Sequence, residues 1–147
     1  MNPNQINWLA VFAAALSTFV IGGLWYSPVL FGKVWMRVNG FSEEQVAGFN
    51  KARAFGGSFI LALVMSANLA MFLADPKTTV VWGMTAGALA GVGWVAAGLG
   101  IIALFENRSW TYILVNGGYH VVAFVAMGAI LGAWRSARSE ALGEILF

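Results

Sequence analysis

His120, the only histidine of the chain, is the side chain best suited to chemistry. It lies inside a stretch from Ser109 to Trp134 that contains no charged residue. Asn116 precedes it by one helical turn, so the two side chains share one face of a helix. An ionisable residue in an apolar segment is costly and is by default a candidate functional site. A histidine there can relay protons, bind a ligand or respond to pH.

A structural role is the alternative for these two residues. Neutral His120 and Asn116 can make interhelical hydrogen bonds, with Ser66, Asn68 or Tyr119 as candidate partners, and each such bond contributes only about 0.6–2 kcal/mol. No second ionisable residue is expected at the same depth, so the sequence favours this structural role over a functional one.

Other chemistries lack the residues they need. The chain has no cysteine, which excludes disulfides, thiolate metal sites and a cysteine nucleophile. A zinc site needs three or four ligands, and one histidine cannot supply them. No serine or threonine of the apolar segments has an adjacent base to activate it. We therefore expect a protein that is not an enzyme and that holds no cofactor or metal.

The composition predicts a membrane protein. Of the 147 residues, 60% are hydrophobic and 10% are charged, whereas soluble domains are about 45–50% apolar and about 25% charged. The net charge of +2 is too small to suggest a nucleic-acid partner, so the lipid bilayer is the expected environment. No Lys or Arg precedes the first apolar run, which indicates a retained span rather than a cleaved signal.

Charged side chains divide the sequence into four apolar windows, and each is long enough for a spanning helix of about 20 residues. The predicted fold class is an all-α integral membrane protein with four transmembrane helices in a single domain, residues 1–147. The expected spans are residues 6–26, 54–74, 79–104 and 111–134.

A short amphipathic helix is predicted between the first two spans, at residues 28–38. Phe31 and Trp35 fall on its apolar face, and Lys33 and Arg37 fall on the opposite face, as in helices that lie in the membrane interface. Residues 42–45 then form a capping-box pattern, and the helix that starts there is expected to continue into the second span.

Two residue classes predict how the spans sit and pack. Aromatic residues near the span ends are typical of interfacial anchors; they are Trp8, Trp25, Tyr26, Phe31, Trp35, Trp110 and Trp134. Glycines at four-residue spacing allow close helix packing, within one bundle or in a homo-oligomer; they are Gly83, Gly87 and Gly91 in the third span and Gly128 and Gly132 in the fourth.

The order of residues resembles a bacterial membrane family catalogued as domain of unknown function 1761. The most specific match is the block at residues 23–36, with its Trp-Tyr-Ser-Pro, Phe-Gly and Trp-Met motifs. Further matches are residues 6–10, the acidic residues 43–44 and residues 116–119. The resemblance implies a small four-span membrane protein and implies no activity.

The sequence favours a non-enzymatic, self-associating helical bundle with a structural or interaction role. The alternative is a small transporter or channel with a path near Asn116 and His120, and a third hypothesis is an enzyme or lipid-modifying accessory protein working at the interfacial helix. The expected location is the plasma membrane, the bacterial inner membrane. Five cations flank the spans on the side of loop 27–53 and three on the other side, so this loop is predicted to be cytoplasmic, with the opposite or a dual orientation still open.

Overall fold

The computed structural model describes residues 6–145, and the side chains of residues 6–135. The described residues form helices and no strands: α1 (Trp8–Trp25), α2 (Gly32–Asn39), α3 (Glu43–Ala47), α4 (Lys51–Phe72), α5 (Val80–Ala90), the π-helix η2 (Gly91–Ala96), α6 (Ala97–Phe105) and α7 (Trp110–Ile145). Four segments are long and apolar enough to cross a membrane: Trp8–Trp25, Lys51–Phe72, Val80–Phe105 and Trp110–Arg135. The predicted fold class is confirmed.

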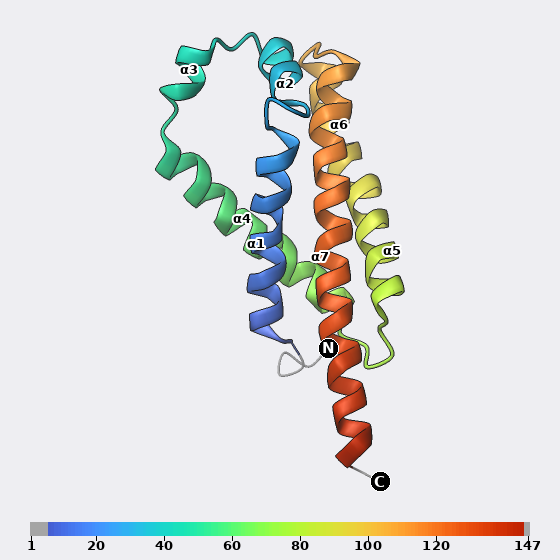
Figure 1. Cartoon of the computed structure of the whole chain (residues 1–147). Helices are drawn as coiled ribbons and strands as arrows, with labels where there is room; N and C mark the ends of the chain where they lie inside the picture. Colours follow the sequence, from blue (N-terminus) through green and yellow to red (C-terminus); the bar gives the residue numbers. More distant parts are fainter. Residues whose placement is uncertain (1–5, 146–147) are drawn as a thin grey trace.

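Helix α7 is the centre of the bundle. Helix α1 packs on one side of it, and the continuous helix formed by α5, η2 and α6 packs on the other (Figure 1). Helix α4 crosses α1 diagonally, and its N-terminal half stands away from the other helices (Figure 1). Helices α2 and α3 and the α6–α7 turn lie at one end of the bundle, which we call the loop end. The start of α1 and the end of α7 lie at the other, the terminal end.

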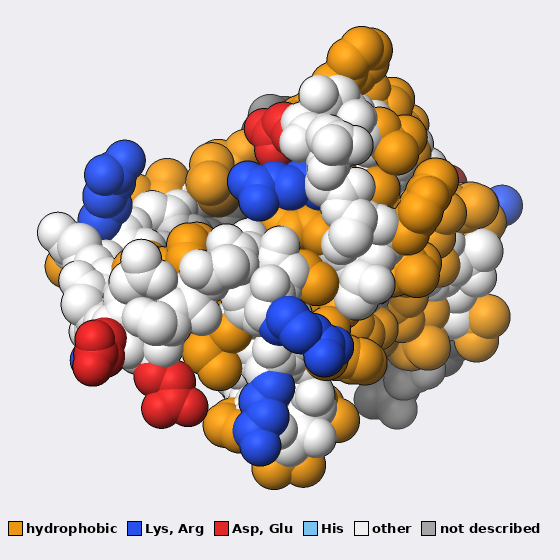
Figure 2. All heavy atoms as spheres, turned by 90° about the horizontal axis from the view of Figure 1, so that it is seen from above, with side chains coloured by type: hydrophobic (Ala, Val, Ile, Leu, Met, Phe, Trp, Pro, Cys, Tyr) orange, Lys and Arg blue, Asp and Glu red, His pale blue; other side chains and the backbone are white. Residues whose placement is uncertain are grey.

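The loop end carries many of the charged side chains. Figure 2 views the molecule from this end and shows Lys, Arg and Glu side chains on it, with hydrophobic side chains around its flanks. Helix α2 brings Lys33 and Arg37 to this end, and α3 brings Glu43 and Glu44. The α6–α7 turn adds the Arg108–Glu106 ion pair, with an N–O distance of 3.5 Å.

Glycines allow α5 and α7 to approach backbone to backbone. A Cβ atom added at Gly83 would collide with the carbonyl oxygen of Gly128, and one added at Gly128 would collide with the carbonyl oxygen of Gly83. Gly87 lies in the same way against the Phe124 carbonyl, and Gly132 lies against Thr79. The glycine ridges that the sequence singles out therefore face each other inside one chain.

The π-helix keeps this small-residue face turned toward α7. Gly91 packs on Val121, and the next contact is Ala96, whose Cβ would lie 3.2 Å from a Cβ added at Gly117. The step from Gly91 to Ala96 is five residues instead of four, which a single π turn accommodates. In an uninterrupted α-helix, the larger Val95 would take the place of Ala96 opposite Gly117.

The turn after α1 differs from the prediction. Helix α2 begins at Gly32 rather than at residue 28, and the Ser27 hydroxyl donates to the Leu24 carbonyl of α1 at 2.7 Å. The chain folds back tightly here, since the Phe31 amide donates to the Trp25 carbonyl at 2.9 Å. A Cβ added at Gly32 would collide with the Tyr26 carbonyl, so the turn requires glycine at this position.

The connection to α4 is also interrupted, contrary to the expectation of a continuous helix. The capping box is present, with the Ser42 hydroxyl accepting from the Gln45 amide at 3.2 Å. However, α3 ends at Ala47, and α4 begins separately at Lys51 with Asn50 as its N-cap. Asn50 accepts from the Arg53 amide at 2.9 Å, and this new cap sets the different direction of α4.

Candidate functional site

A crevice of about 770 Å³ lies between α1, α4 and α7 in the half of the bundle nearer the loop end. Its walls are formed by residues within 18–26, in α1 and its C-cap Tyr26, by residues within 55–65 of α4, and by Tyr119 and His120 of α7. Leu61 and Val64 line it and are themselves exposed, so the crevice is open along its α4 side. Ligand sites in proteins have volumes of about 300–1,000 Å³, and this crevice is within that range.

The crevice exists because α4 leans away from α1. Residues 51–58 of α4 are all exposed. Phe19 bridges the gap, with ring centroids 6.3 Å from Phe55 and 5.9 Å from Phe59. On the α1 wall, Gly22 and Gly23 provide no side chain to fill the space, and a Cβ added at Gly23 would meet nothing within 4 Å.

The crevice is closed toward the terminal end. The Ser66 hydroxyl donates to the Val11 carbonyl at 2.9 Å, and both residues are fully buried. Ala14, Ala62 and Leu69 pack around this contact in the hydrophobic core. Helices α1 and α4 are therefore in direct contact on the side of the crevice that faces the terminal end.

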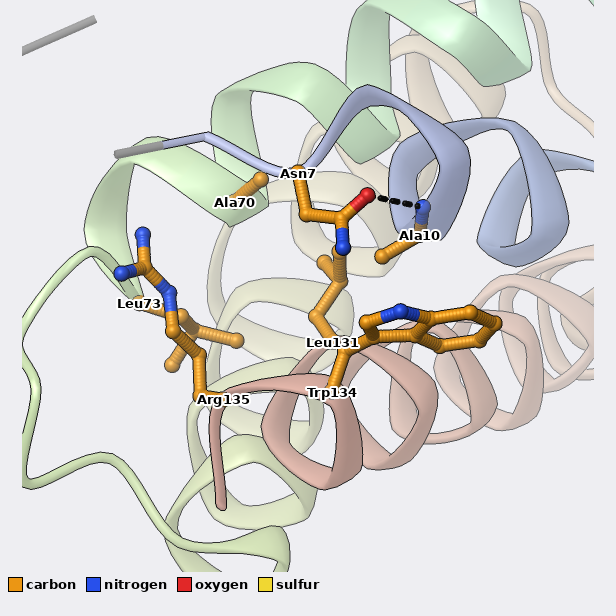
Figure 3. Close-up of a pocket in the computed structure, with 7 residues that line it drawn as sticks. All are labelled: Asn7, Ala10, Ala70, Leu73, Leu131, Trp134 and Arg135. Carbon is orange, nitrogen blue, oxygen red and sulfur yellow. Dashed lines mark hydrogen bonds between the residues drawn. The ribbon is translucent and has the colours of Figure 1, made fainter. Parts of the chain in front are cut away.

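A second, much smaller pocket lies beyond this contact, where α1, α4 and α7 meet at the terminal end (Figure 3). Its volume is about 20 Å³, which is room for a single water. Figure 3 shows the Asn7 oxygen turned toward the Ala10 amide, which donates to it at 3.2 Å, with Trp134 and Arg135 of α7 on the opposite side. Of these two cavities, only the larger crevice has room for a ligand of several carbon atoms.

Three hydrogen bonds connect the C-terminal half of α1 and its C-cap Tyr26 to α7. The Tyr26 hydroxyl donates to Asn116 Oδ1 at 3.0 Å, and the Trp25 indole donates to the Val115 carbonyl at 2.9 Å. The Tyr119 hydroxyl donates to the Thr18 carbonyl at 3.2 Å. The Asn116 amide nitrogen donates to the Tyr112 carbonyl at 2.9 Å, which turns Asn116 Oδ1 toward Tyr26.

His120 has no hydrogen bond to any described residue. Its Nδ1 atom is buried without a partner, while Nε2 is not fully buried and the residue lines the crevice. Its ring packs on Tyr119, with centroids 5.0 Å apart. His120 follows the first residue of α7 by ten positions, which places it about 15 Å along the helix, near the middle of a hydrocarbon layer about 30 Å thick.

Aromatic rings connect α2 to this wall. Tyr26 lies 5.3 Å from Tyr119 and 5.9 Å from Trp35, measured between ring centroids. Trp25 lies 4.7 Å from Phe31. Lys33 and Arg37, on the other face of α2, are exposed. The helix therefore has its apolar face on the bundle and its charged face outward, as the sequence predicts.

The structure brings together only part of the predicted polar site. His120 and Asn116 lie along the same wall, Asn116 through its bond to Tyr26. Ser66 lies in the contact that closes the crevice. Asn68 is exposed and donates to the Val64 carbonyl of its own helix, so it does not join the site.

The predicted interfacial anchors fall into two groups. Trp8 and Trp110 are 60% and 68% exposed, and Trp134 is also exposed, so their rings are accessible to lipid. The other four are half-buried and pack on the bundle: Trp25, Tyr26, Phe31 and Trp35.

Sequence reasoning missed Tyr26 and Thr18 as parts of this wall. Tyr26 contacts a residue 90 positions away, and no local pattern indicates such a contact. Thr18 donates its own hydroxyl to Ala15 and contributes its backbone carbonyl to Tyr119, which no side-chain pattern reveals. The available signal for Tyr26 was its place in the Trp-Tyr-Ser-Pro block.

The residue types of the site limit its chemistry. Among the described residues there is no group of three or more His, Cys, Asp or Glu side chains that could hold a metal ion. The polar groups of the crevice are one imidazole, two phenols and two aliphatic hydroxyls. These groups can form hydrogen bonds with a ligand.

The four apolar helices and the intramembrane crevice define a small multi-pass membrane protein. The chain belongs to the family described as protein of unknown function DUF1761, whose model matches residues 9–132. No curated protein and no solved structure matches it. The matched region includes the whole crevice and its aromatic wall.

Proposed function

We propose that this protein binds a lipophilic small molecule, which enters the crevice from the bilayer. The crevice beside His120 carries the proposal, because it combines a ligand-sized volume, a largely apolar lining and a few polar groups at one wall. This combination is typical of small-molecule sites, which bury an apolar ligand and fix its orientation by a few hydrogen bonds.

The side opening supports entry from lipid. The exposed part of α4 that borders the crevice is mainly apolar, with Phe55 and Leu61 61% and 63% exposed, and Ser58 is its one polar side chain. A ligand that is dissolved in the hydrocarbon can pass this wall without crossing a charged barrier. The proposal therefore develops the transporter hypothesis, with the path limited to one side of the bundle.

The closed end favours binding or carriage over an open channel. A channel needs a continuous polar path, whereas the Ser66–Val11 hydrogen bond and the surrounding core fill the bundle below His120. A ligand could pass from the crevice to the terminal end only if α4 separated from α1.

Self-association, the role that the sequence favours, has less support than ligand binding. Its main argument was the glycine ridges, and these glycines pack between α5 and α7 of the same chain. Enzymatic activity is not part of the proposal, because the crevice offers hydrogen-bonding groups without a nucleophile and base in contact. We propose that the protein lies in the bacterial inner membrane. Loop 27–53 is then on the cytoplasmic side, because five flanking cations lie on that side and three on the other.

Photolabelling tests the proposal. The purified protein in lipid nanodiscs is irradiated with an alkyne-tagged hexadecyl diazirine, a probe without a polar head, and labelled peptides are mapped by mass spectrometry. We expect labels concentrated on residues 18–26 and 55–65. Even labelling around the bundle, or crosslinks between two copies across the crevice, would contradict ligand binding.

A matched pair of variants sharpens the test. Gly23→Trp fills the crevice, since a side chain at Gly23 meets no neighbour within 4 Å. Gly98→Trp places the same side chain on α6, where a Cβ also meets nothing within 4 Å. We expect Gly23→Trp to abolish labelling in the crevice and Gly98→Trp to preserve it. Equal labelling in the two variants would locate the probe elsewhere.

A further inference from the structure

The unpaired hydrogen-bonding groups of the crevice define the polar head of its ligand, an inference that rests on the proposed binding function. His120 is the clearest of these groups, because neither ring nitrogen bonds to a described residue. A neutral imidazole has one N–H donor and one acceptor nitrogen. The position of its proton therefore decides what a ligand must offer.

Burial of Nδ1 favours the tautomer of His120 that carries its proton on Nε2. If Nδ1 carried it, a buried N–H would have no acceptor, and such orphaned donors are rare in proteins. With the proton on Nε2, the buried atom is a lone pair and the N–H belongs to the nitrogen that is not fully buried. His120 then offers the crevice a hydrogen-bond donor.

The two tyrosines beside His120 offer acceptors. The Tyr26 proton is committed to Asn116 Oδ1 at 3.0 Å, and the Tyr119 proton is committed to the Thr18 carbonyl at 3.2 Å. Each phenol oxygen keeps a lone pair when its proton is committed. The rings of Tyr26, Tyr119 and His120 are neighbours, with successive centroids 5.3 and 5.0 Å apart. One polar group can therefore face both a donor and an acceptor.

The lining of the crevice also disfavours a ligand with a charged head. No Asp, Glu, Lys or Arg is among the described residues that line the crevice. A charged head placed there would be desolvated without a counter-ion, at a large cost in free energy. A neutral head with both donor and acceptor capacity meets all of these conditions, and a hydroxyl group is the simplest such head.

We propose that the ligand is a neutral amphiphile with a free hydroxyl group on a long apolar chain. Its oxygen accepts a hydrogen bond from His120 Nε2, its proton is donated to the oxygen of Tyr119 or Tyr26, and its chain lies against α4. A long-chain alcohol and a diacylglycerol share this chemistry.

Competition against the diazirine probe tests this proposal in the full-length protein in nanodiscs. The competitors are 1-hexadecanol, hexadecyl methyl ether, which can accept but not donate, and hexadecane. We expect the alcohol to compete about tenfold better than the ether, the effect of one net hydrogen bond. Equal competition by alcohol and ether, with labelling still confined to the crevice, overturns the hydroxyl head while the binding function stands. Absence of crevice labelling overturns both.

Charged competitors test the neutrality of the head. Hexadecyl sulfate and hexadecyltrimethylammonium, at low mole fraction, should compete less well than hexadecanol. Stronger competition by either ion overturns the proposal. Dihexadecanoylglycerol distinguishes the two sources: if it competes better than hexadecanol, the head belongs to a diacylglycerol, and if it competes less well, the head belongs to a free alcohol.

Variants of His120 test the donor. His120→Phe should remove the preference for hexadecyl methyl ether over hexadecane, because the ether oxygen can only accept the hydrogen bond that His120 Nε2 donates, and crevice labelling should not be lost. His120→Gln retains an N–H near the position of Nε2 and should retain part of the preference, which provides a second reading if His120→Phe does not fold. An unchanged preference in His120→Phe would show that His120 does not contact the head.

Discussion

The Tyr26 hydroxyl donates a hydrogen bond to Asn116 Oδ1 at 3.0 Å, and this bond joins the end of α1 to the first third of α7. Tyr26 also closes the crevice wall by its ring contacts with Tyr119 and Trp35. The Trp-Tyr-Ser-Pro block at the end of α1 and the polar segment of α7 around Asn116 thus form one structural unit. In lipid, such a bond cannot be replaced by water, which makes its contribution measurable.

We predict that Tyr26→Phe and Asn116→Leu are coupled. Interhelical hydrogen bonds in membrane proteins contribute about 0.6–2 kcal/mol, so each variant should lower the free energy of unfolding by about that amount. The double variant should lose less than the sum, because both changes remove the same bond. Unfolding in mixed micelles, followed by circular dichroism, measures all three values.

Tyr112→Phe is the control for this cycle. Asn116 bonds to the backbone carbonyl of Tyr112, and the Tyr112 hydroxyl has no hydrogen bond to a described residue. Its removal should leave stability within about 0.5 kcal/mol of the parent. Strictly additive losses for Tyr26→Phe and Asn116→Leu would show that the bond contributes nothing in the membrane.

A second prediction concerns the α5–α7 interface. Gly83→Ala inserts a methyl group against the Gly128 carbonyl and must separate the two helices. Overpacking of this kind costs about 1–3 kcal/mol. Gly93→Ala on the same continuous helix meets nothing within 4 Å and should be neutral or slightly stabilising. Thermal unfolding of the two variants gives the comparison, and equal melting temperatures would contradict the close glycine packing.

The sequence predicts the helices well because their signals are local. Charge-free windows gave the four spans, and the pattern of residues 42–45 gave the capping box. The crevice could not be predicted, because it results from the direction of α4. That direction is set by the break at Gly48–Asn50, where the sequence shows neither proline nor a long polar run.

The glycines also show how far the sequence can predict packing. Their spacing predicts close packing, but it does not say whether the partner helix belongs to the same chain. The structure pairs Gly83 and Gly87 with α7 of the same chain. The π turn at Gly91–Ala96 could not be predicted from the sequence alone. The five-residue spacing between Gly91 and Ala96 indicates it only when both residues are known to face α7.

The orientation of the chain gives a third prediction. The native sequence has no cysteine, so single cysteines can report on it without background. Glu44→Cys on α3 and Lys77→Cys in the α4–α5 turn are both exposed and lie at opposite ends of the bundle. We expect a membrane-impermeant maleimide to label Lys77→Cys in whole spheroplasts and Glu44→Cys only in inverted vesicles. The reverse pattern would place loop 27–53 outside the cytoplasm.

The last prediction concerns the π turn. A π turn is an α-helix with one extra residue, so deletion of Gly93 should convert the segment Val80–Phe105 to a continuous α-helix. Gly91 and Ala96 would then be four positions apart and would still face α7. Because a Cβ at Gly93 meets no neighbour, no packing is lost, and stability should remain within about 1 kcal/mol of the parent.

Deletion of Ala88 is the matched control, because it shortens the same continuous helix by one residue within α5. It places Gly91 only three positions after Gly87 and rotates one of them away from α7, where Gly87 opposes the Phe124 carbonyl and Gly91 opposes Val121. A larger side chain must then enter an interface that has no room for it, so this deletion should destabilise the protein by several kcal/mol more than deletion of Gly93. Equal losses would mean that the π turn does not set the register of the α5–α7 interface.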